Sequence, residues 1–223
     1  EFAVGKPQVI LHGSEEPMER VTVDVIQEHA GTVVSMLVKR KGELREIENR
    51  GGYVRQEFLM PSRGLIGLRT RLLTATRGEA VIHSILEGYG PHRGAIPGRA
   101  NGVQVSMAAG QAVAYSLFNL KDRGPHFVKP GEPIYEGQIV GENCRSDDIV
   151  VNPCKGKKLT NVRASGSDDA VLLSPPRVFS VEEALEYVGE DELVEFTPKS
   201  IRLRKRVLKE SERRKLARAA SRV

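Results

Sequence analysis

The order of hydrophobic periods between Pro17 and Tyr89 constrains the fold more than any other feature of the sequence. The valines from Val21 to Val25 alternate with polar residues, which is the pattern of a half-buried strand. Apolar residues from Ala30 to Val38 then recur at intervals of three and four, which places them on one face of a helix. Basic residues and Gly42 follow, so we predict that the helix ends there with Gly42 in the left-handed conformation.

The pattern continues with two more strands, a second helix and a last strand. Alternating runs at Glu43 to Glu48 and Tyr53 to Met60 flank a turn and predict a hairpin. Ser62 is the predicted N-cap of a helix that closes at Gly78, and alternation resumes from Glu79 to Tyr89. The order β-α-β-β-α-β predicts a ferredoxin-like domain over residues 17–90, with two helices on one face of a four-stranded antiparallel sheet.

Residues 91–102 are rich in glycine and proline and are predicted to be a linker. Beyond them, short apolar runs separated by turn signals predict a β-rich domain over residues 103–208, which we expect to form a small barrel. The fold class is therefore α+β. The runs are Val103–Met107, Ala112–Leu120, Pro133–Glu142, Ile149–Asn152 and Ala170–Leu173.

Two further patterns lie near the C-terminus. Ser180 and Glu183 have the spacing of a capping box, and the residues that follow predict a short helix up to Val188. Residues 201–207 alternate, so a strand there would bury one side and display Arg202, Arg204 and Arg206 on the other. Residues 209–223 are predicted to be a basic tail that forms a fraying helix.

Positive charge is concentrated at this end of the chain. The net charge of the whole sequence is +5. The segment Lys199 to Val223 holds eleven Lys and Arg residues against Glu210 and Glu212, so it carries +9 and the remainder carries −4. Because clustered cations release condensed counterions when they bind phosphates, we expect this end to dock on a polyanion. A solvated, charged terminus is the alternative.

The cysteines and the apolar content indicate a cytoplasmic protein. Cys144 and Cys154 are too few for a disulfide framework and fit no zinc or redox spacing, which favours a reducing compartment. The sequence has no apolar stretch long enough to span a membrane, and its first residues lack the layout of a signal peptide.

The sequence offers little catalytic chemistry. Gly156 and Lys157 are followed by another lysine, so the segment does not have the spacing of a phosphate-binding loop. A metal hydrolase could be built around the acidic pairs 147–148 and 168–169 with His92 or His126. Acids that form turns explain these pairs adequately, and the histidines are scattered, so we expect no metal site.

The segment from Cys154 to Gly166 favours RNA binding instead. It combines lysines, an arginine and small hydrogen-bonding side chains on a glycine-containing backbone, as contacts to phosphates and 2′-hydroxyls require. It contains no aromatic residue for base stacking, which favours recognition of shape and backbone over sequence. A polar solvated loop remains the alternative.

Several longer motifs resemble one family. The stretches NGVQVSMAAGQAVAYSLFNLKDRG, IYEGQIVGENCRSDDIVVN and GKKLTNVRASGSDDAV are similar to the C-terminal half of the BipA (TypA) family of ribosome-binding translational GTPases, and MPSRGLIGLRT also resembles domain V of elongation factor G. The resemblance covers nearly the whole chain. It implies that residues 1–16 lead out of a preceding domain, that residues 17–90 correspond to domain V, and that residues 103–208 form the domain specific to this family.

The resemblance also implies a function and a site. The loop from Arg145 to Gly166 would reach ribosomal RNA of the large subunit, of the 23S type, and A-site tRNA, in stress-responsive translation or large-subunit assembly. The residues expected to bind RNA are Arg145, Ser146, Asn152, Lys155, Lys157, Lys158, Thr160, Asn161, Arg163, Ser165, Arg202, Arg204 and Arg206.

The family's GTPase domain is missing from this sequence. We therefore expect a non-catalytic monomer without cofactor, since GTP and magnesium belong to the missing domain, and without a membrane or small-molecule partner. The alternative is a protein–protein interaction module whose RNA affinity resides in the missing domains, with the helix at residues 181–188 and the exposed sheet face of the first domain as contact surfaces.

Overall fold

The structure is a computed structural model that describes residues 2–96, 98–156 and 173–220. The chain divides into two compact units, which are described separately. The first unit is Pro7–Gly98, and the second combines Glu1–Lys6 with Arg99–Val223. Within the described ranges, no helix has the length and apolar character needed to cross a membrane.

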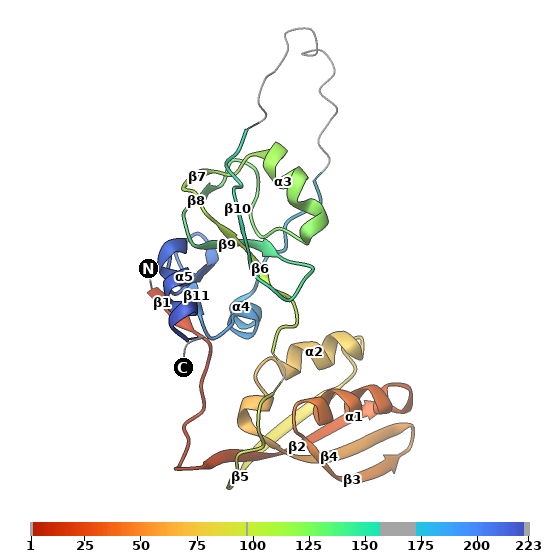
Figure 1. Ribbon diagram of the computed structural model, residues 1–223. Coiled ribbons are helices and arrows are strands. Elements are labelled where there is room, and N and C mark those ends of the chain that lie inside the picture. The colour runs from red at the N-terminus through yellow and green to blue at the C-terminus, as the bar shows by residue number, and fades with distance from the viewer. Residues whose placement is uncertain (1, 97, 157–172, 221–223) are drawn as a thin grey trace. The chain divides into compact units, whose positions relative to one another are not determined.

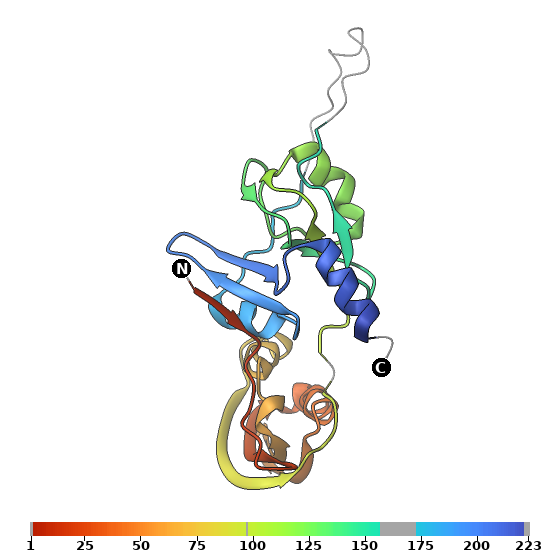
Figure 2. The same cartoon turned by 60° about the vertical axis from the view of Figure 1, so that its left-hand side comes forward.

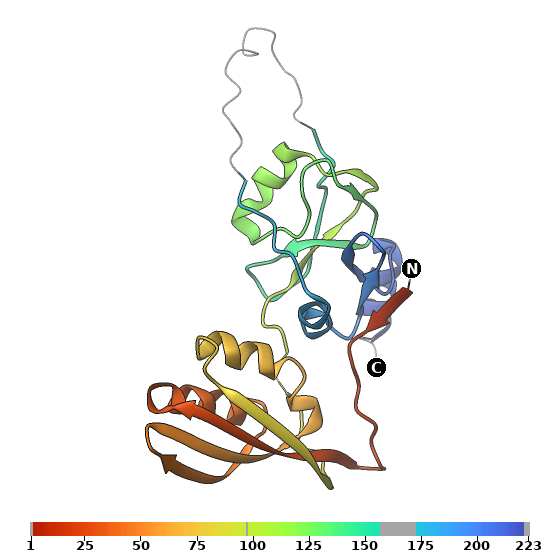
Figure 3. The same cartoon turned by 180° about the vertical axis from the view of Figure 1, so that it is seen from behind.

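The first unit has the predicted ferredoxin-like topology. Its sheet has the order β3-β4-β2-β5 and every neighbouring pair is antiparallel. Helices α1 and α2 lie on the same face of this sheet, and the opposite face carries no helix of this unit (Figures 1 and 3). The elements are β2 (Glu15–Ile26), η1 (Gln27–His29), α1 (Ala30–Lys39), β3 (Glu43–Arg50), β4 (Tyr53–Pro61), η2 (Ser62–Gly64), α2 (Leu68–Ala75) and β5 (Val81–Pro91).

The period-two and helical patterns explain the core of this unit. The alternating valines of β2 are fully buried, and Val33 and Leu37 of α1 and Leu68 and Leu72 of α2 pack against them. Burial of each such side chain contributes roughly 1.5–3 kcal/mol, so the apolar stripe of each helix is what holds it on the sheet.

Two predicted helix ends were wrong. Ser62 begins the short helix η2 rather than α2, which starts at Leu68 after Gly67 has turned the chain with φ of 68°. At the end of α1, Lys41 rather than Gly42 adopts the left-handed conformation, with φ of 68°. Gly42 is needed for close approach instead, because a Cβ there would lie 2.9 Å from the carbonyl oxygen of Leu37.

The second unit contains an open six-stranded sheet, so the predicted barrel was wrong for the described residues. The strand order is β1-β11-β12-β9-β6-β10, and β1 and β10 are its edges (Figures 1 and 2). The edge strand β1 is formed by residues that the family resemblance had led us to expect as the exit from a preceding domain. The strands are β1 (Phe2–Gly5), β6 (Val103–Ser106), β9 (Gln138–Glu142), β10 (Ile149–Val151), β11 (Glu192–Phe196) and β12 (Ile201–Lys205), with β7 (Gly110–Gln111) and β8 (Pro133–Ile134) as a separate pair.

Helices complete this unit. The run Ala112–Leu120, expected to be a strand, forms α3 (Ala114–Leu120), followed by η3 (Lys121–Arg123). Its apolar residues pack only on one side, with Leu117 buried against Val140 and Val151. The capping box of α4 (Val181–Tyr187) is confirmed, and α5 (Glu210–Ala220) is the basic helix near the C-terminus. Strand β11 was missed, and most of the run Ala170–Leu173 lies outside the described residues.

Gly102 is more than a flexible linker residue. A Cβ atom built at this position would lie 2.2 Å from the backbone oxygen of Asp147 and 2.8 Å from the nitrogen of Asp148. The backbone of Gly102 also donates to the carbonyl of Arg145 at 2.7 Å and accepts from Asn143 at 2.8 Å. Only glycine allows the chain before β6 to approach the turn before β10 so closely.

We therefore predict that Gly102→Ala destabilises the second unit by about 1–3 kcal/mol, the usual cost of overpacking, because the obstacle is backbone that cannot rotate away. Urea unfolding of the purified chain measures this. Gly98→Ala, where a Cβ would meet nothing within 4 Å, is the matched control and should change the free energy of unfolding little. Equal effects of both substitutions would contradict the assignment.

Candidate nucleic-acid interface

A buried carboxylate organises the strands that carry the predicted arginine row. Glu192, at the start of β11, is 0% exposed. The two terminal nitrogens of the Arg99 guanidinium, Nη1 and Nη2, donate to it at 3.0 and 2.9 Å, and the backbone nitrogen of Gly189 donates at 2.7 Å. The guanidinium of Arg99 also lies 4.6 Å from the centre of the Tyr187 ring. The network thus ties the residues before β6 to the α4–β11 connection.

Lys205 extends this network from the paired strand β12. It is 3% exposed, and its Nζ lies 2.9 Å from Glu192, 2.8 Å from Asp191 and 2.5 Å from Asp148. Burial alone would lower the pKa of Lys205, but the negative charge of Glu192 and the carboxylates bonded to it outweigh burial and raise that pKa. Lys205 is therefore a charged structural residue that is already neutralised.

The three arginines of the predicted strand at residues 201–207 do not form one row. Arg202 lines a hollow beside β12, together with the segment that precedes α4. Arg204 lies 4.0 Å from the carboxylate of Glu195, which also accepts a hydrogen bond from the Tyr135 hydroxyl. Arg206 lies beyond the end of the strand, is exposed, and donates to the backbone carbonyl of Glu190 at 3.2 Å. The predicted buried side is confirmed, since Leu203 and Lys205 are buried.

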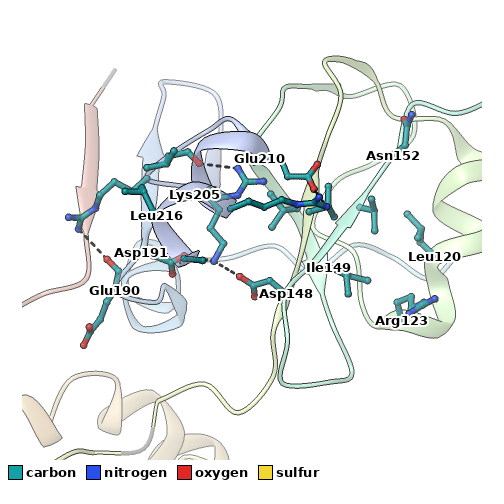
Figure 4. A pocket seen from close by; sticks show the side chains of 18 residues that line it. Leu120, Arg123, Asp148, Ile149, Asn152, Glu190, Asp191, Lys205, Glu210 and Leu216 are labelled. Atoms are coloured by element: carbon teal, nitrogen blue, oxygen red, sulfur yellow. Dashed lines mark hydrogen bonds and ion pairs between the residues drawn. The ribbon is translucent and has the colours of Figure 1, made fainter. Parts of the chain in front are cut away.

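Arg206 lines an open groove of about 1290 Å³ in the second unit, which we call the α5 groove (Figure 4). Its lining is apolar where β10 and Leu216 contribute, and it carries five cations and four carboxylates. Figure 4 shows Lys205 directed between Asp148 and Asp191, so that its positive charge is taken up by these carboxylates. The five cations are Arg123, Lys205, Arg206, Arg213 and Arg214.

Three of these cations keep their charge available. Arg214 is paired with Glu210 in the same helix. Within the described part of the chain, Arg123, Arg206 and Arg213 form no ion pair; Arg213 donates instead to the carbonyl oxygen of Val207 at 2.9 Å. Guanidinium groups without a carboxylate partner can bind phosphate oxygens in a two-pronged geometry.

The predicted loop residues are separated by strand β10. Arg145 and Ser146 are exposed in the turn before β10, whereas Asn152 and Lys155 are exposed after it. The expectation of a single loop from Arg145 to Gly166 was wrong, because the short apolar run that forms β10 divides this segment. Asn152 also holds its own turn, because its side-chain oxygen accepts from the Cys154 nitrogen at 3.0 Å.

The remaining predicted RNA contacts lie outside the described residues. They are Lys157, Lys158, Thr160, Asn161, Arg163 and Ser165.

Of the two acidic pairs, Asp168 and Asp169 lie outside the described residues, and Asp148 of the other pair is engaged within the fold. Asp148 accepts from the Val103 nitrogen at 2.9 Å and binds Lys205, so its carboxylate is used in the fold. His126 is buried, burial lowers the pKa of its ring, and its Nε2 lies 2.8 Å from the Leu117 carbonyl. Among the described residues, no three His, Cys, Asp or Glu side chains come together as metal ligands would.

Comparison with known proteins identifies the class of protein first. The family model for the elongation factor G C-terminus matches residues 14–100, and that for the TypA/BipA C-terminal domain matches residues 101–210. The chain is therefore built from C-terminal domains of translation factors.

Curated relatives then identify the family. Proteins named "Large ribosomal subunit assembly factor BipA" are 48% identical in Salmonella typhimurium and in Escherichia coli K12, over 96% and 98% of this chain, and 46% identical in Bacillus subtilis, over 97%. The chain spans 36–37% of the length of these relatives. The chain belongs to the TypA/BipA family and, as predicted, consists of its C-terminal, non-GTPase domains.

We predict that Glu192→Gln destabilises the second unit by about 3–5 kcal/mol, because it removes the one carboxylate that half-buried Arg99 and buried Lys205 share and leaves Arg99 without an ion-pair partner. Denaturant unfolding of the second unit measures the loss. Glu182→Gln, on the exposed first turn of α4, removes the same charge from the surface and should cost less than about 1 kcal/mol. A similar small cost for both variants would show that the network is not structural.

The same carboxylate predicts a pH dependence. Burial would raise the pKa of Glu192, but the hydrogen bonds from Arg99 and the charges of Lys205 and Arg99 outweigh it, so the pKa lies below its ordinary value of 4.5. Its stabilisation is then complete above that value and is lost as the pH falls through the lower pKa of the folded state. The difference in unfolding free energy between wild type and Glu192→Gln should shrink as the pH falls from about 6 to about 3. A difference independent of pH would contradict this.

Proposed function

We propose that this chain is the ribosome-associating C-terminal part of a BipA-family factor that acts in the cytoplasm in stress-responsive translation or large ribosomal subunit assembly. Its contacts are ribosomal RNA and, at the A site, tRNA. The relatives that support this proposal carry the name large ribosomal subunit assembly factor. In this function these 223 residues act by binding, and GTP chemistry belongs to the family's GTPase domain.

The observation that carries the RNA contact is the distribution of unpaired cations in the second unit. Arg145 and Lys155 are exposed on either side of β10, and Arg206 is exposed in the α5 groove. Within the described residues, none of the three is bound to a carboxylate, in contrast to Lys205 and Arg204. Exposed cations that the protein does not neutralise itself are those that gain most from binding phosphates.

Ribosome co-sedimentation tests this proposal. The change of Lys155, Lys157, Lys158 and Arg163 to Ala should weaken binding and reduce the slope of log affinity against log salt by about 3–4, since each phosphate contact contributes about 0.9 in duplex-like sites. Binding and slope that remain at the wild-type values would rule out the loop as a contact.

A matched control removes cations that are already paired. Arg20, Arg50 and Arg55 each form an ion pair with an acidic residue of the first unit, at 3.7, 2.7 and 2.7 Å. Changing all three to Gln removes three positive charges, compared with four in the loop variant, yet it should leave ribosome binding nearly unchanged. An equal loss in this control would mean that total charge, and not the loop, governs binding.

One observation favours the alternative function, a protein–protein contact. On the open sheet face of the first unit, the register places Glu46 directly opposite Glu57, and no other described residue forms an ion pair with either. Two like charges so placed destabilise the sheet by roughly 0.2–1 kcal/mol, and exposed Tyr53 and Ile85 lie on the same face. Such a face suits a basic protein segment better than RNA.

The helix that we named as the other contact surface is less suitable. Ala184 and Val188 of the α4 region are buried in the core of the second unit, so its apolar face is already occupied. A chain that binds no RNA at low salt yet increases in mass with concentration in light scattering would support the alternative.

A further inference from the structure

We infer that the hollow beside β12 in the second unit is a binding site for an RNA phosphate backbone, separate from the loop after β10. This inference rests on the proposed function, since RNA is the polyanion that a ribosome-associated chain meets. The hollow has a volume of about 770 Å³ and is lined by four segments that are separated in the sequence. These lie within residues 127–132, 138–139, 176–179 and 197–203. We call it the basic hollow.

The charge of the basic hollow is strongly one-sided. Four cations line it, Lys129, Arg177, Lys199 and Arg202, and Glu132 is the one carboxylate in its described lining. The α5 groove is nearly balanced by comparison, with five cations against four carboxylates. An excess of three positive charges around a concave surface concentrates an anionic ligand there.

Two of these cations stand on turns whose geometry the fold already sets. Lys129 lies in a turn where its backbone nitrogen donates to the Glu132 carboxylate at 3.0 Å. This hydrogen bond occupies the one acidic side chain in the described lining of the hollow. Lys199 lies in the turn between β11 and β12, closed by the bond from the Thr197 nitrogen to the Ser200 carbonyl at 3.0 Å. Both residues are exposed, and within the described chain neither forms an ion pair.

Arg202, which lines the hollow, has an unsatisfied donor. Its Nε is buried and has no hydrogen-bond partner among the described residues. A buried donor without an acceptor costs free energy, which a ligand oxygen would recover. Arg177 is held at the rim, with its guanidinium 4.5 Å from the centre of the Phe179 ring and 3.9 Å from the Glu142 carboxylate.

The aromatic residues of the hollow favour phosphate contact over base stacking. Phe127 and Phe179 pack edge to face with ring centres 4.8 Å apart, and both also pack against Tyr187. Because Arg177 already covers the ring of Phe179, that face is not free for a base. The site is therefore expected to bind the backbone with little sequence preference.

Fluorescence anisotropy with a labelled twelve-nucleotide oligouridylate tests the site in the full 223-residue chain. The triple variant Lys129→Gln, Lys199→Gln and Arg202→Gln should bind more weakly, and the slope of log affinity against log salt should fall by about 2, because each lost phosphate contact contributes about 0.7 on single strands. The variant of Arg20, Arg50 and Arg55 to Gln removes the same charge and should bind as wild type does. Equal slopes for the hollow variant and wild type would overturn the inference.

Three further measurements make the result specific. Thermal melting should show that the triple variant is folded. A benzophenone amino acid at Val178, which is 77% exposed and lines the hollow, should crosslink to the oligouridylate, whereas the same group at Tyr53 of the first unit should not. Oligoglutamate of the same charge serves as a competitor. If it displaces the labelled oligouridylate at a lower concentration than unlabelled oligouridylate does, the site belongs to an acidic protein segment and the inference is overturned.

Ribosome co-sedimentation separates this inference from the proposed function. If the triple variant pellets with ribosomes as wild type does and also keeps its oligouridylate affinity, the basic hollow is not an RNA site and the proposed function stands. If wild type itself fails to pellet at low salt, the proposed function fails, while the oligouridylate result still decides whether the hollow binds phosphates.

Discussion

The buried carboxylate of Glu192 is the interaction on which the second unit depends. It receives Arg99 from the residues before β6 and Lys205 from β12, so one side chain joins segments more than ninety positions apart. Through Lys205 the same network reaches Asp148. The backbone of the preceding residue, Asp147, lies so close to position 102 that only glycine fits there. The turn that displays Arg145 is thereby attached to the core of the sheet.

Internal neutralisation decides which cations can act on a partner. The sequence concentrates positive charge near its C-terminus, yet Lys205, Arg204 and Arg214 are occupied by carboxylates of the same unit. The cations that remain available come from separate elements, including the residues on either side of β10, Arg206 and the lining of the basic hollow. The open sheet face of the first unit has the reverse charge character. There, three arginines are paired with carboxylates, whereas two of the glutamates have no cation partner among the described residues.

Local patterns predicted what depends on local physics. The ferredoxin-like order followed from alternation in β2 and helical spacing in α1, and the capping box of α4 followed from two residues three positions apart. Contacts between distant segments could not be predicted in this way. The pairing of β1 with β11, the open sheet in place of a barrel, and the role of Gly102 each depend on residues far along the chain. The basic hollow was missed for the same reason, because Lys129, Arg177 and Lys199 are single cations in unrelated segments and only folding brings them together.

In the function that we propose, cations left unpaired by the fold contact RNA of the large ribosomal subunit. Chemical footprinting of ribosomal RNA, with purified large subunits and the 223-residue chain, detects such contacts. We expect protected riboses and phosphates in large-subunit RNA, with protection that fades as salt is raised and disappears when the loop and hollow cations are removed together. Stable association of the chain with the subunit, without any protected nucleotide, would contradict it and would indicate contact through protein alone.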